Sequence, residues 1–255
     1  MTGNMVFDYL LIGVFAAAAF SGLALFFIDA PYGRHKSGGW GPKINTRLGW
    51  VLMESPASLV FLYFFLTGEN NTSIVAITLL VMWQLHYFHR AFIYPFQIKV
   101  KPGDSVPFMV IFMGGSYCAI NGFLNGSFIS MYSDHLNNEW LTDPRFGLGI
   151  LLFAFGYYLN KKSDQILRDL RKGGSTEGYK IPYGLGYKYV SMPNYLGEIL
   201  TWTGFALAAW SLAGVSFVVF TMANLVPRAI ANHKWYLETF DDYPKDRKAI
   251  FPKLL

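Results

Sequence analysis

Glu54 is the acidic residue whose place in the sequence most needs a chemical explanation. It is the one charged residue in the apolar run 48–66, which reads LGWVLMESPASLVFLYFFL. A helix of about 20 residues, rising 1.5 Å per residue, is long enough to cross the hydrocarbon core of a bilayer. A charged side chain at that depth costs about 2.5–3.5 kcal/mol on insertion scales, and it normally faces other protein groups. Glu54 therefore predicts a polar partner and a functional site inside the membrane.

The next apolar run carries several polar side chains within the sequence WQLHYFHRAFIY. On an ideal helix Tyr87, Arg90 and Tyr94 share one face, and His86 and His89 form an adjoining stripe. An interfacial belt of aromatic and basic side chains explains only one or two of these residues. The two histidines lack an evident third ligand, so no metal is predicted. The density of polar groups favours a substrate or cofactor site.

A second polar pattern follows the apolar run 146–160. Asp164, Arg168 and Arg171 lie four, eight and eleven residues after Asn160, on one helical face, while apolar residues occupy the opposite face. This pattern predicts that the fifth span continues as a helix into the cytoplasm. Its polar face is either a solvated surface with i,i+4 charge pairs or a phosphate site. Arginine suits phosphate because its planar guanidinium donates two parallel hydrogen bonds.

Residues 173–191 form a Gly-, Tyr- and Lys-rich segment without helical or strand periodicity, which is typical of an ordered loop. Its aromatic rings, Tyr179 among them, either pack over an adenine or ribose or anchor the loop on the membrane surface. Asn194 and Glu198 then open the sixth span. An N-cap at Asn194, with Glu198 near the positive end of the helix dipole, is a purely structural explanation of that pair.

The elements that must position these residues are membrane-spanning helices. The chain is 53% hydrophobic and 15% charged, unlike a soluble domain. The sequence predicts an all-α, single-domain, polytopic membrane protein with seven transmembrane helices. The last two helices are expected to form a hairpin that turns at Leu212-Ala213-Gly214. The seven apolar runs are 6–28, 48–66, 74–94, 107–124, 146–160, 195–212 and 214–226.

Basic residues fall on one side of these spans. One set of loops holds nearly every Lys and Arg, and the opposite set holds Arg145 alone. The positive-inside rule therefore predicts an N-terminus outside and a C-terminus in the cytoplasm. The host membrane would be a bacterial inner membrane or the endoplasmic reticulum. The net charge of +5 reflects this topology and not a nucleic-acid partner. Cys118 is the only cysteine, which excludes a disulfide framework.

Four motifs occur together and in a fixed order. They are HYFHR at 86–90, SDxxLRxLR at 163–171, YVSxxNxLGE at 189–198 and WYLxxFDDYPK at 235–245. With these motifs the chain resembles the steroid 5α-reductase family, and the similarity runs from the second span to the C-terminus. Its short length and its termini are similar to those of bacterial or type-2-like members.

The resemblance implies a seven-helix membrane reductase. NADPH would bind from the cytoplasmic side, and a lipophilic 3-oxo-4-ene steroid would arrive through the membrane lipid, with no obligate protein partner. Residues 1–145 would form mainly the substrate side and 146–255 mainly the cofactor side. Glu54 and Tyr87 are implied as the catalytic residues. The implied cofactor-binding residues are Arg90, Tyr94, Asn160, Asp164, Arg171, Tyr179, Asn194, Glu198, Arg228, Asn232 and Tyr236.

The implied reaction explains a polar pair inside the membrane. Hydride addition at C5 of the steroid moves negative charge onto the C3 oxygen, and donors aimed at that oxygen in a dry site stabilise it. The Tyr87 hydroxyl would donate directly. Glu54 would donate only when protonated, and as a carboxylate it would accept from Tyr87 and fix the direction of that hydroxyl. Tyr87 is therefore the predicted partner of Glu54.

The chain departs from vertebrate members at three places. Met53 stands where they have a Gln beside the Glu, and Ala-Asn-His at 231–233 stands where they have a His-rich stretch. Ile98, Lys99 and Lys101 lie where the family has Asn and Arg groups near the 2′-phosphate. The steroid pocket and the phosphate contacts are thus the parts that the resemblance specifies least.

Three alternatives to a steroid reductase stay open at this point. One is a related enoyl or polyprenol reductase. Another is a membrane methyltransferase of the isoprenylcysteine type, which also has a polar C-terminal half that binds a nucleotide-like cofactor. The third is a transporter with Glu54 on an ion path, which the absence of inverted repeats disfavours.

Overall fold

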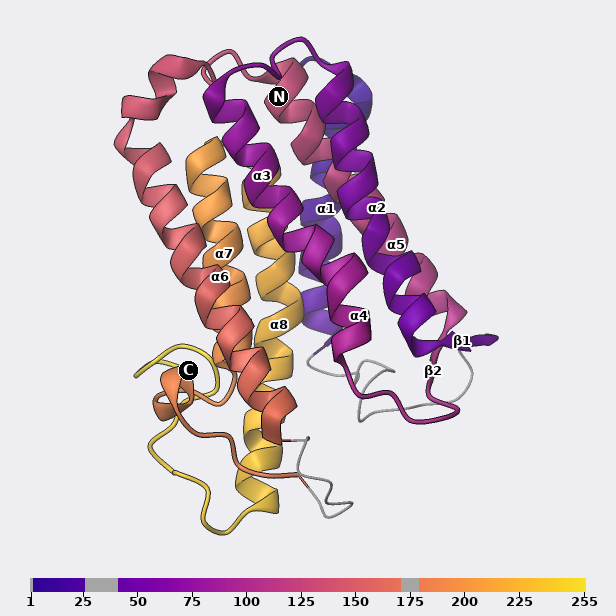
Figure 1. Cartoon of the computed structure of the whole chain (residues 1–255), viewed down its shortest axis with the longest axis vertical. Coiled ribbons are helices and arrows are strands. Elements are labelled where there is room, and N and C mark those ends of the chain that lie inside the picture. The colour runs from indigo at the N-terminus through magenta and orange to yellow at the C-terminus, as the bar shows by residue number, and fades with distance from the viewer. Residues whose placement is uncertain (1, 26–40, 171–178) are drawn as a thin grey trace.

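The computed structural model describes residues 2–25, 41–170 and 179–255 of the chain. In these ranges a helix lies at each predicted span (Figure 1). By length and composition, α1, α2, α8 and the helix from α5 to Tyr132 are suited to cross a membrane. Seven crossings and the orientation of the termini stay predictions. The helices are α1 (Met5–Ala24), α2 (Thr46–Thr67), α3 (Ile74–Phe88), α4 (Tyr94–Gln97), α5 (Phe108–Ser127), α6 (Pro144–Leu170), α7 (Pro193–Ala209) and α8 (Leu212–Thr239).

Short non-α elements interrupt this bundle. β1 (Lys43–Asn45) and β2 (Ser105–Pro107) pair antiparallel, so two predicted loops meet as a small ribbon beside α2 and α5. Single π turns extend α3 over His89–Ile93 and α5 over Phe128–Tyr132. Short 3₁₀ helices cover Asn138–Thr142 and Leu185–Lys188. The all-α prediction is therefore right for the bundle and misses the ribbon, whose three-residue strands carry little periodic signal.

The hairpin between α7 and α8 is confirmed, but its turn lies earlier than predicted. Trp210 ends α7 in the left-handed region, with φ +45°, and the Ser211 hydroxyl caps α8 by accepting from Gly214 N at 2.9 Å. The Arg145 guanidinium lies over the Trp210 ring at 4.5 Å, which anchors the strained residue. Gly214 lies inside α8. A Cβ at this position would come within 2.8 Å of the Ala206 backbone, so the close contact with α7 requires glycine. The glycine serves close packing and not the turn.

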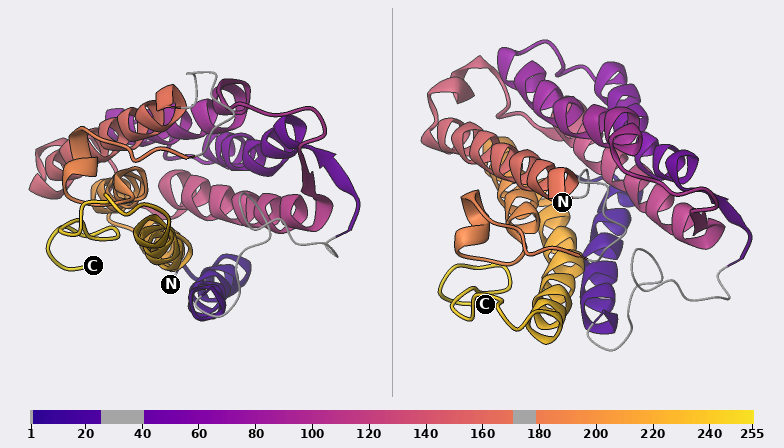
Figure 2. Two further views of the ribbon diagram at one scale, coloured as in Figure 1. Left: turned by 90° about the horizontal axis from the view of Figure 1, so that it is seen from below. Right: turned by 60° about the horizontal axis from the view of Figure 1, so that its bottom comes forward.

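α6 and α7 approach each other backbone to backbone (Figures 1 and 2). Gly149 and Gly156 of α6 face Gly204 and Gly197 of α7. A Cβ added to Gly197 would lie 2.4 Å from the backbone nitrogen of Asn160, so a larger residue would force the helices apart. Small residues on both helices are the usual means of close packing in membranes. This contact places the polar residues of α6 directly against those of α7.

The interior of the bundle is built around Trp83 of α3. Its indole stacks on Phe61 of α2 at 4.6 Å and tilts against Trp202 of α7 at 5.3 Å and Phe217 of α8 at 5.6 Å. The indole nitrogen donates to the backbone oxygen of Ala57 at 2.8 Å, so its polar atom is also satisfied. Aromatic pairs in such offset and tilted geometries add to the stabilisation from buried area. The cluster fixes α3 between α2 and α7.

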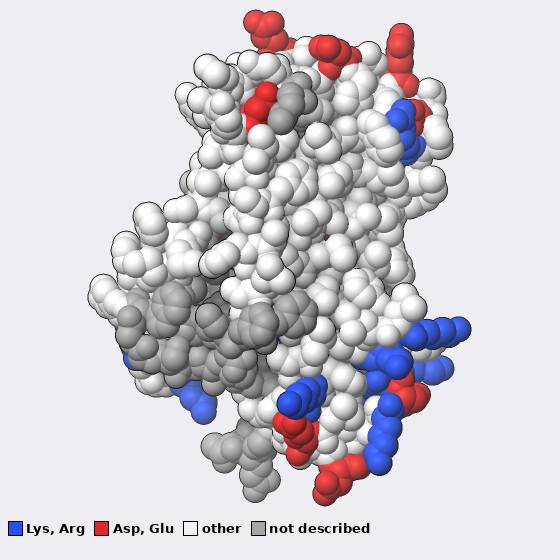
Figure 3. Space-filling model, turned by 180° about the vertical axis from the view of Figure 1, so that it is seen from behind, with Lys and Arg blue, Asp and Glu red and all other residues white. Residues whose placement is uncertain are grey.

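Charged side chains gather at the two ends of the molecule, with a wide uncharged band between them (Figure 3). One end is mainly acidic, and the other carries most of the visible Lys and Arg together with several acids. The band has the character expected of a surface in contact with lipid, since exposed side chains such as Phe20, Tyr63 and Leu151 belong to the helices. The charge split is the one that the loop sequences predicted.

Candidate active site

Glu54 lies on α2, and its side chain is 11% exposed. The carboxylate Oε1 accepts a hydrogen bond from Nε of Arg90 at 3.3 Å, and Oε2 lies 3.9 Å from the Cys118 sulfur. Arg90 thus takes the place that the sequence analysis gave to Tyr87. A guanidinium next to a carboxylate in a low-dielectric site gains more electrostatic energy than a neutral phenol does. Because Nε makes the contact, the ends of the guanidinium stay free of Glu54.

Arg90 lies on the π turn that follows α3. The backbone N–H of Tyr94 donates to the carbonyl of His89, five residues earlier, which defines the extra residue in this turn. Single π turns of this kind are frequent at functional sites. The guanidinium lies over the rings of Trp50 at 5.1 Å and Tyr94 at 5.5 Å. The predicted shared face of Arg90 and Tyr94 is thus retained, although the helix is not ideal there.

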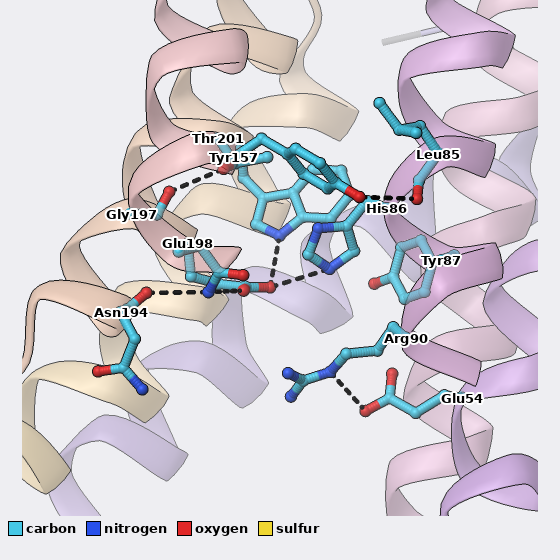
Figure 4. A network of polar contacts seen from close by, with 12 residues as sticks. Glu54, Leu85, His86, Tyr87, Arg90, Tyr157, Asn194, Gly197, Glu198 and Thr201 are labelled. Carbon is cyan, nitrogen blue, oxygen red and sulfur yellow. Dashed lines mark hydrogen bonds and ion pairs between the residues drawn. The ribbon is translucent and has the colours of Figure 1, made fainter. Parts of the chain in front are cut away.

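The Tyr87 ring is held on several sides by other aromatic residues. It lies 5.0 Å from Trp83, 5.5 Å from Trp202 and 6.2 Å from Phe217, and the residue is 4% exposed. The hydroxyl accepts a hydrogen bond from Asn121 Nδ2 of α5 at 3.5 Å. Figure 4 shows this hydroxyl pointing toward the side on which Arg90 and Glu54 lie. The Tyr87 hydroxyl and the Glu54 carboxylate therefore lie in the same region, and each is bonded to a different partner.

Glu198 of α7 is a second carboxylate in the bundle interior, with a side chain 13% exposed, and it has three hydrogen-bond partners. Oε1 contacts His86 Nε2 at 3.1 Å and accepts from Trp202 Nε1 at 3.2 Å. Oε2 accepts from Asn160 Nδ2 at 2.9 Å. These bonds join α3, α6 and α7 around one acid (Figure 4). Each donor is aimed at the carboxylate, so the charge is well compensated inside the bundle.

Asn194 extends the network toward the end of α6. Its side-chain nitrogen donates to Asp164 Oδ1 at 3.0 Å, and its backbone oxygen accepts from Asn160 at 3.0 Å. The predicted N-cap role is wrong, because α7 begins at Pro193 and Asn194 lies inside its first turn. Proline suits the first helical position, and the amide is used for a tertiary contact instead. Asp164 is bound in this way, so its part of the α6 face is not simply a solvated surface.

Comparison with known proteins identifies a family whose match includes several residues of this network. The family described as 3-oxo-5-alpha-steroid 4-dehydrogenase matches residues 104–255, which include Asn160, Asp164, Asn194 and Glu198. The steroid 5-alpha-reductase DET2 of Gossypium hirsutum is 40% identical over 97% of this chain and 96% of its own length. The human 3-oxo-5-alpha-steroid 4-dehydrogenase 1 is 41% identical over 89% of this chain and 86% of its own, and the Macaca fascicularis protein is 40% identical over 88% and 84%.

The chain belongs to the steroid 5α-reductase family. It is accordingly an oxidoreductase that acts on CH–CH bonds, a class that is consistent with a nicotinamide cofactor. The apolar helices agree with a membrane protein. Family membership favours the reductase prediction over the methyltransferase and transporter alternatives.

The remaining predicted site residues of this 5α-reductase family member that the structure describes lie on α8 or beside its C-terminal half. Tyr236 is buried and stacks on Tyr243 at 5.0 Å, while Tyr179 lies edge-on to Trp235 at 5.1 Å. Asn232 donates to the backbone oxygen of Arg228 one turn earlier, at 2.8 Å. Arg171 lies outside the described residues.

Sequence reasoning missed two residues of the site. His86 was noted only as part of a stripe, and the structure makes it the partner of Glu198. Asn121 was not singled out, although Asn121 and Asn125 lie four residues apart in an apolar run, where amides need partners. That spacing was the available signal. In both cases the partner lies on another helix, which no local pattern identifies.

Proposed function

We propose that the chain reduces the 4,5 double bond of 3-oxo-4-ene steroids with NADPH, giving 5α-steroids. The observation that carries this proposal is the incomplete pairing of Glu54 within residues 2–25, 41–170 and 179–255. Its carboxylate has one ion pair at 3.3 Å and a thiol at 3.9 Å, beside the phenol of Tyr87, within helices whose other faces are apolar. A lipophilic molecule with one polar oxygen suits such surroundings, and the relatives are named for that reaction.

The substrate oxygen would be recognised by Tyr87. When hydride reaches C5, the electron pair of the double bond shifts toward the C3 oxygen, and C4 then takes a proton from Tyr87 or from water. The Tyr87 hydroxyl donates to the developing oxyanion, a contact whose loss typically costs about 10²–10³ in rate. Glu54 acts at the same oxygen when protonated. As a carboxylate it holds Arg90 in place beside the reacting groups.

Buried acceptors next to the network fit the polar groups of NADPH. The side-chain oxygens of Asn160 and Asn194 and Nδ1 of His86 are buried without a hydrogen-bond partner among the described residues. Unpaired buried acceptors are uncommon and call for donors, and a carboxamide or a ribose hydroxyl supplies them. Asp164 and Arg90 complete this set, while Arg228, Asn232, Tyr179 and Tyr236 would line the rest. NADPH when bound supplies the hydride, and these side chains orient it.

The topology gives the two reactants separate routes. The end of α6 and the start of α7, which carry Asp164 and Asn194, lie toward the end of the molecule with most of the visible Lys and Arg (Figures 1 and 3). We assign this end to the cytoplasm by the charge split. The cofactor would therefore bind from the cytoplasmic side. The steroid would reach Tyr87 and Glu54 from the bilayer. Whether the host membrane is a bacterial inner membrane or the endoplasmic reticulum does not change this arrangement.

Turnover by purified protein tests the proposal. The protein in detergent is mixed with NADPH and testosterone or progesterone, and oxidation is followed at 340 nm together with the mass of the product. Conversion to a product two hydrogens heavier is expected. Unreacted enone with saturating NADPH, in folded protein, would exclude the steroid substrate. A polyprenol and an enoyl thioester, tested in parallel, then identify another reductase activity.

Variants test the assigned residues. Tyr87→Phe and Glu54→Gln are each expected to slow turnover about 10²-fold, since each removes a group at the reacting oxygen. Tyr63→Phe, on the exposed face of α2, is the matched control for the loss of a phenol. Glu139→Gln, in an exposed 3₁₀ helix, is the matched control for the loss of a carboxylate. Wild-type rates in both site variants would remove Tyr87 and Glu54 from the mechanism.

A further inference from the structure

The hydrogen-bond direction at Tyr87 is set by residues that the proposed mechanism does not use. A phenol oxygen has one proton to donate and lone pairs that accept. If a neighbouring protein group accepts that proton, the hydroxyl has no proton left to donate to a substrate. If a neighbour donates instead, the proton stays available to a substrate. The Tyr87 ring is already fixed by Trp83 and Trp202 at 5.0 and 5.5 Å, so the rotation of its hydroxyl is the freedom left.

Two buried amides on α5 decide this direction. Asn121 and Asn125 are each 1% exposed. Asn125 Nδ2 donates to the backbone oxygen of Asn121 at 3.1 Å, and a carbonyl can only accept, so the nitrogen of Asn125 must be on this side. The same nitrogen donates to Asn121 Oδ1 at 2.9 Å. The oxygen of the Asn121 amide is therefore turned to Asn125, and its nitrogen is turned to Tyr87, 3.5 Å from the hydroxyl.

We infer that Asn121 is a positioning residue that makes Tyr87 a proton donor toward the substrate, with Asn125 holding the Asn121 amide in the required orientation. This inference rests on the proposed function. The Asn121 N–H donates to the phenol oxygen, so the phenol proton points away from α5 and toward the region of Glu54 and Arg90. A donor at the phenol oxygen also stabilises the oxygen when its proton is shared with a developing oxyanion.

The helix that carries Asn121 and Asn125 also lies next to the Glu54 carboxylate. Cys118, one turn before Asn121 on α5, brings its sulfur to 3.9 Å from Glu54 Oε2. One face of α5 therefore lies behind both proposed catalytic groups. α5 is held there by its contact with α2, where a Cβ on Gly126 would come within 2.7 Å of the Phe61 oxygen. The close approach keeps the amides within reach of Tyr87.

Asn121→Leu tests the inference with little risk to the fold. Leucine is of similar size and has no hydrogen-bonding group, and Asn125 keeps its bond to the backbone oxygen of residue 121. We expect kcat to fall about tenfold with the KM for NADPH unchanged, because an indirect effect is smaller than the loss of a direct donor. Ser127→Ala, at another fully buried polar position on α5, is the matched control and is expected to keep the wild-type rate.

A double-mutant cycle separates positioning from packing. If Asn121 acts through Tyr87, then Asn121→Leu slows the wild-type protein but causes no further loss when combined with Tyr87→Phe. An equal loss in both backgrounds, or an unchanged kcat in Asn121→Leu, would overturn the inference while leaving the proposed function intact. A wild-type rate in Tyr87→Phe would instead overturn the role of Tyr87 and, with it, that of Asn121.

A spectroscopic arm does not depend on turnover. In protein with ring-labelled tyrosine, the infrared C–O stretch of Tyr87 is identified by its absence from Tyr87→Phe. A hydrogen bond accepted by the phenol oxygen lowers this frequency, so Asn121→Leu should raise it, and Ser127→Ala should leave it unchanged. An unchanged band in Asn121→Leu would show that the amide does not donate to Tyr87, whatever the substrate of the enzyme is.

Discussion

Two glutamates lie in the interior of the same bundle, with side chains 11% and 13% exposed, and they differ in how fully they are bonded. Glu198 has three donors within 2.9–3.2 Å, from three helices. Glu54 has one ion pair at 3.3 Å and a thiol at 3.9 Å. Burying a carboxylate is costly unless its oxygens are bonded. Glu198 meets that requirement from the protein alone, so its role is to hold α3, α6 and α7 together. Glu54 has fewer partners among the described residues, which agrees with the proposed role of binding a ligand.

The helices around the two acids differ in the same sense. Glu198 belongs to α7, whose glycines Gly197 and Gly204 lock it against the α6 backbone. Glu54 lies on α2, two residues before Pro56, and its partner Arg90 lies on a π turn. Proline removes a backbone donor and a π turn adds a residue, so both loosen the regular helix. Glu198, the more fully bonded acid, thus lies in regular, close-packed helices, and Glu54, the proposed catalytic acid, lies next to irregular ones.

Loss of Glu198 should give the largest effect on stability. Glu198→Leu leaves His86, Trp202 and Asn160 without their acceptor, and breaking such a buried network typically lowers the unfolding free energy by about 3–5 kcal/mol. Unfolding in detergent, followed by circular dichroism against denaturant, measures this. A loss below about 1 kcal/mol would mean that the network does not hold the helices. Glu139→Gln is the control for removing an exposed acid.

Loss of Glu54 should affect catalysis and not folding. Glu54→Gln should lower kcat about 10²-fold, equivalent to about 2.7 kcal/mol of transition-state stabilisation, while changing the unfolding free energy little. The same two measurements on Glu198→Leu and Glu54→Gln give opposite patterns. If Glu54→Gln unfolds the protein as readily as Glu198→Leu does, the two acids are equivalent and the contrast is wrong.

The close packing of α6 and α7 can be tested with one methyl group. A Cβ on Gly204 would lie 2.3 Å from the backbone nitrogen of Phe153, so Gly204→Ala should cost about 1–3 kcal/mol through overpacking. Gly147, on α6, has nothing within 4 Å of its Cβ position. Gly147→Ala should therefore be neutral or slightly stabilising, since alanine favours helix. Equal effects of the two alanines on the melting temperature would contradict the structure.

The smallest effect is expected at an exposed ion pair. Asp143 accepts from Arg145 Nη2 at 2.7 Å and Nε at 2.9 Å, and these bonds hold the pKa of Asp143 below its ordinary range, at about 2. A carboxyl with a lower pKa in the folded state stabilises the fold above its unfolded pKa, and this contribution is lost as pH falls toward 2. The difference in melting temperature between wild type and Asp143→Asn should therefore shrink from about pH 6 to pH 3. A constant difference would exclude this contribution.

The helices and the candidate residues could be predicted from the sequence to a large extent. Every predicted span contains a helix, because apolar runs and their length report local structure directly. Glu54 was singled out because an acid in an apolar run is unusual by itself, whereas Glu198 entered the candidate set through the family resemblance. The turn at Trp210 was missed, since a left-handed tryptophan is stabilised by a distant Arg145. The N-cap at Asn194 was wrong because its amide is bound by Asp164 of another helix.

What the sequence by itself determined is which residues must be buried and polar at once. The acid of Glu54 and the phenol of Tyr87 lie in runs whose length and hydropathy place them inside a bilayer. Only the tertiary structure decided their partners. Arg90 pairs with Glu54 across 36 positions of sequence, and Asn121 reaches Tyr87 across 34. A hydrogen bond forms only when the distance between donor and acceptor is correct to within a few tenths of an ångström. The packing of the helices sets that distance, and no local sequence pattern reports it.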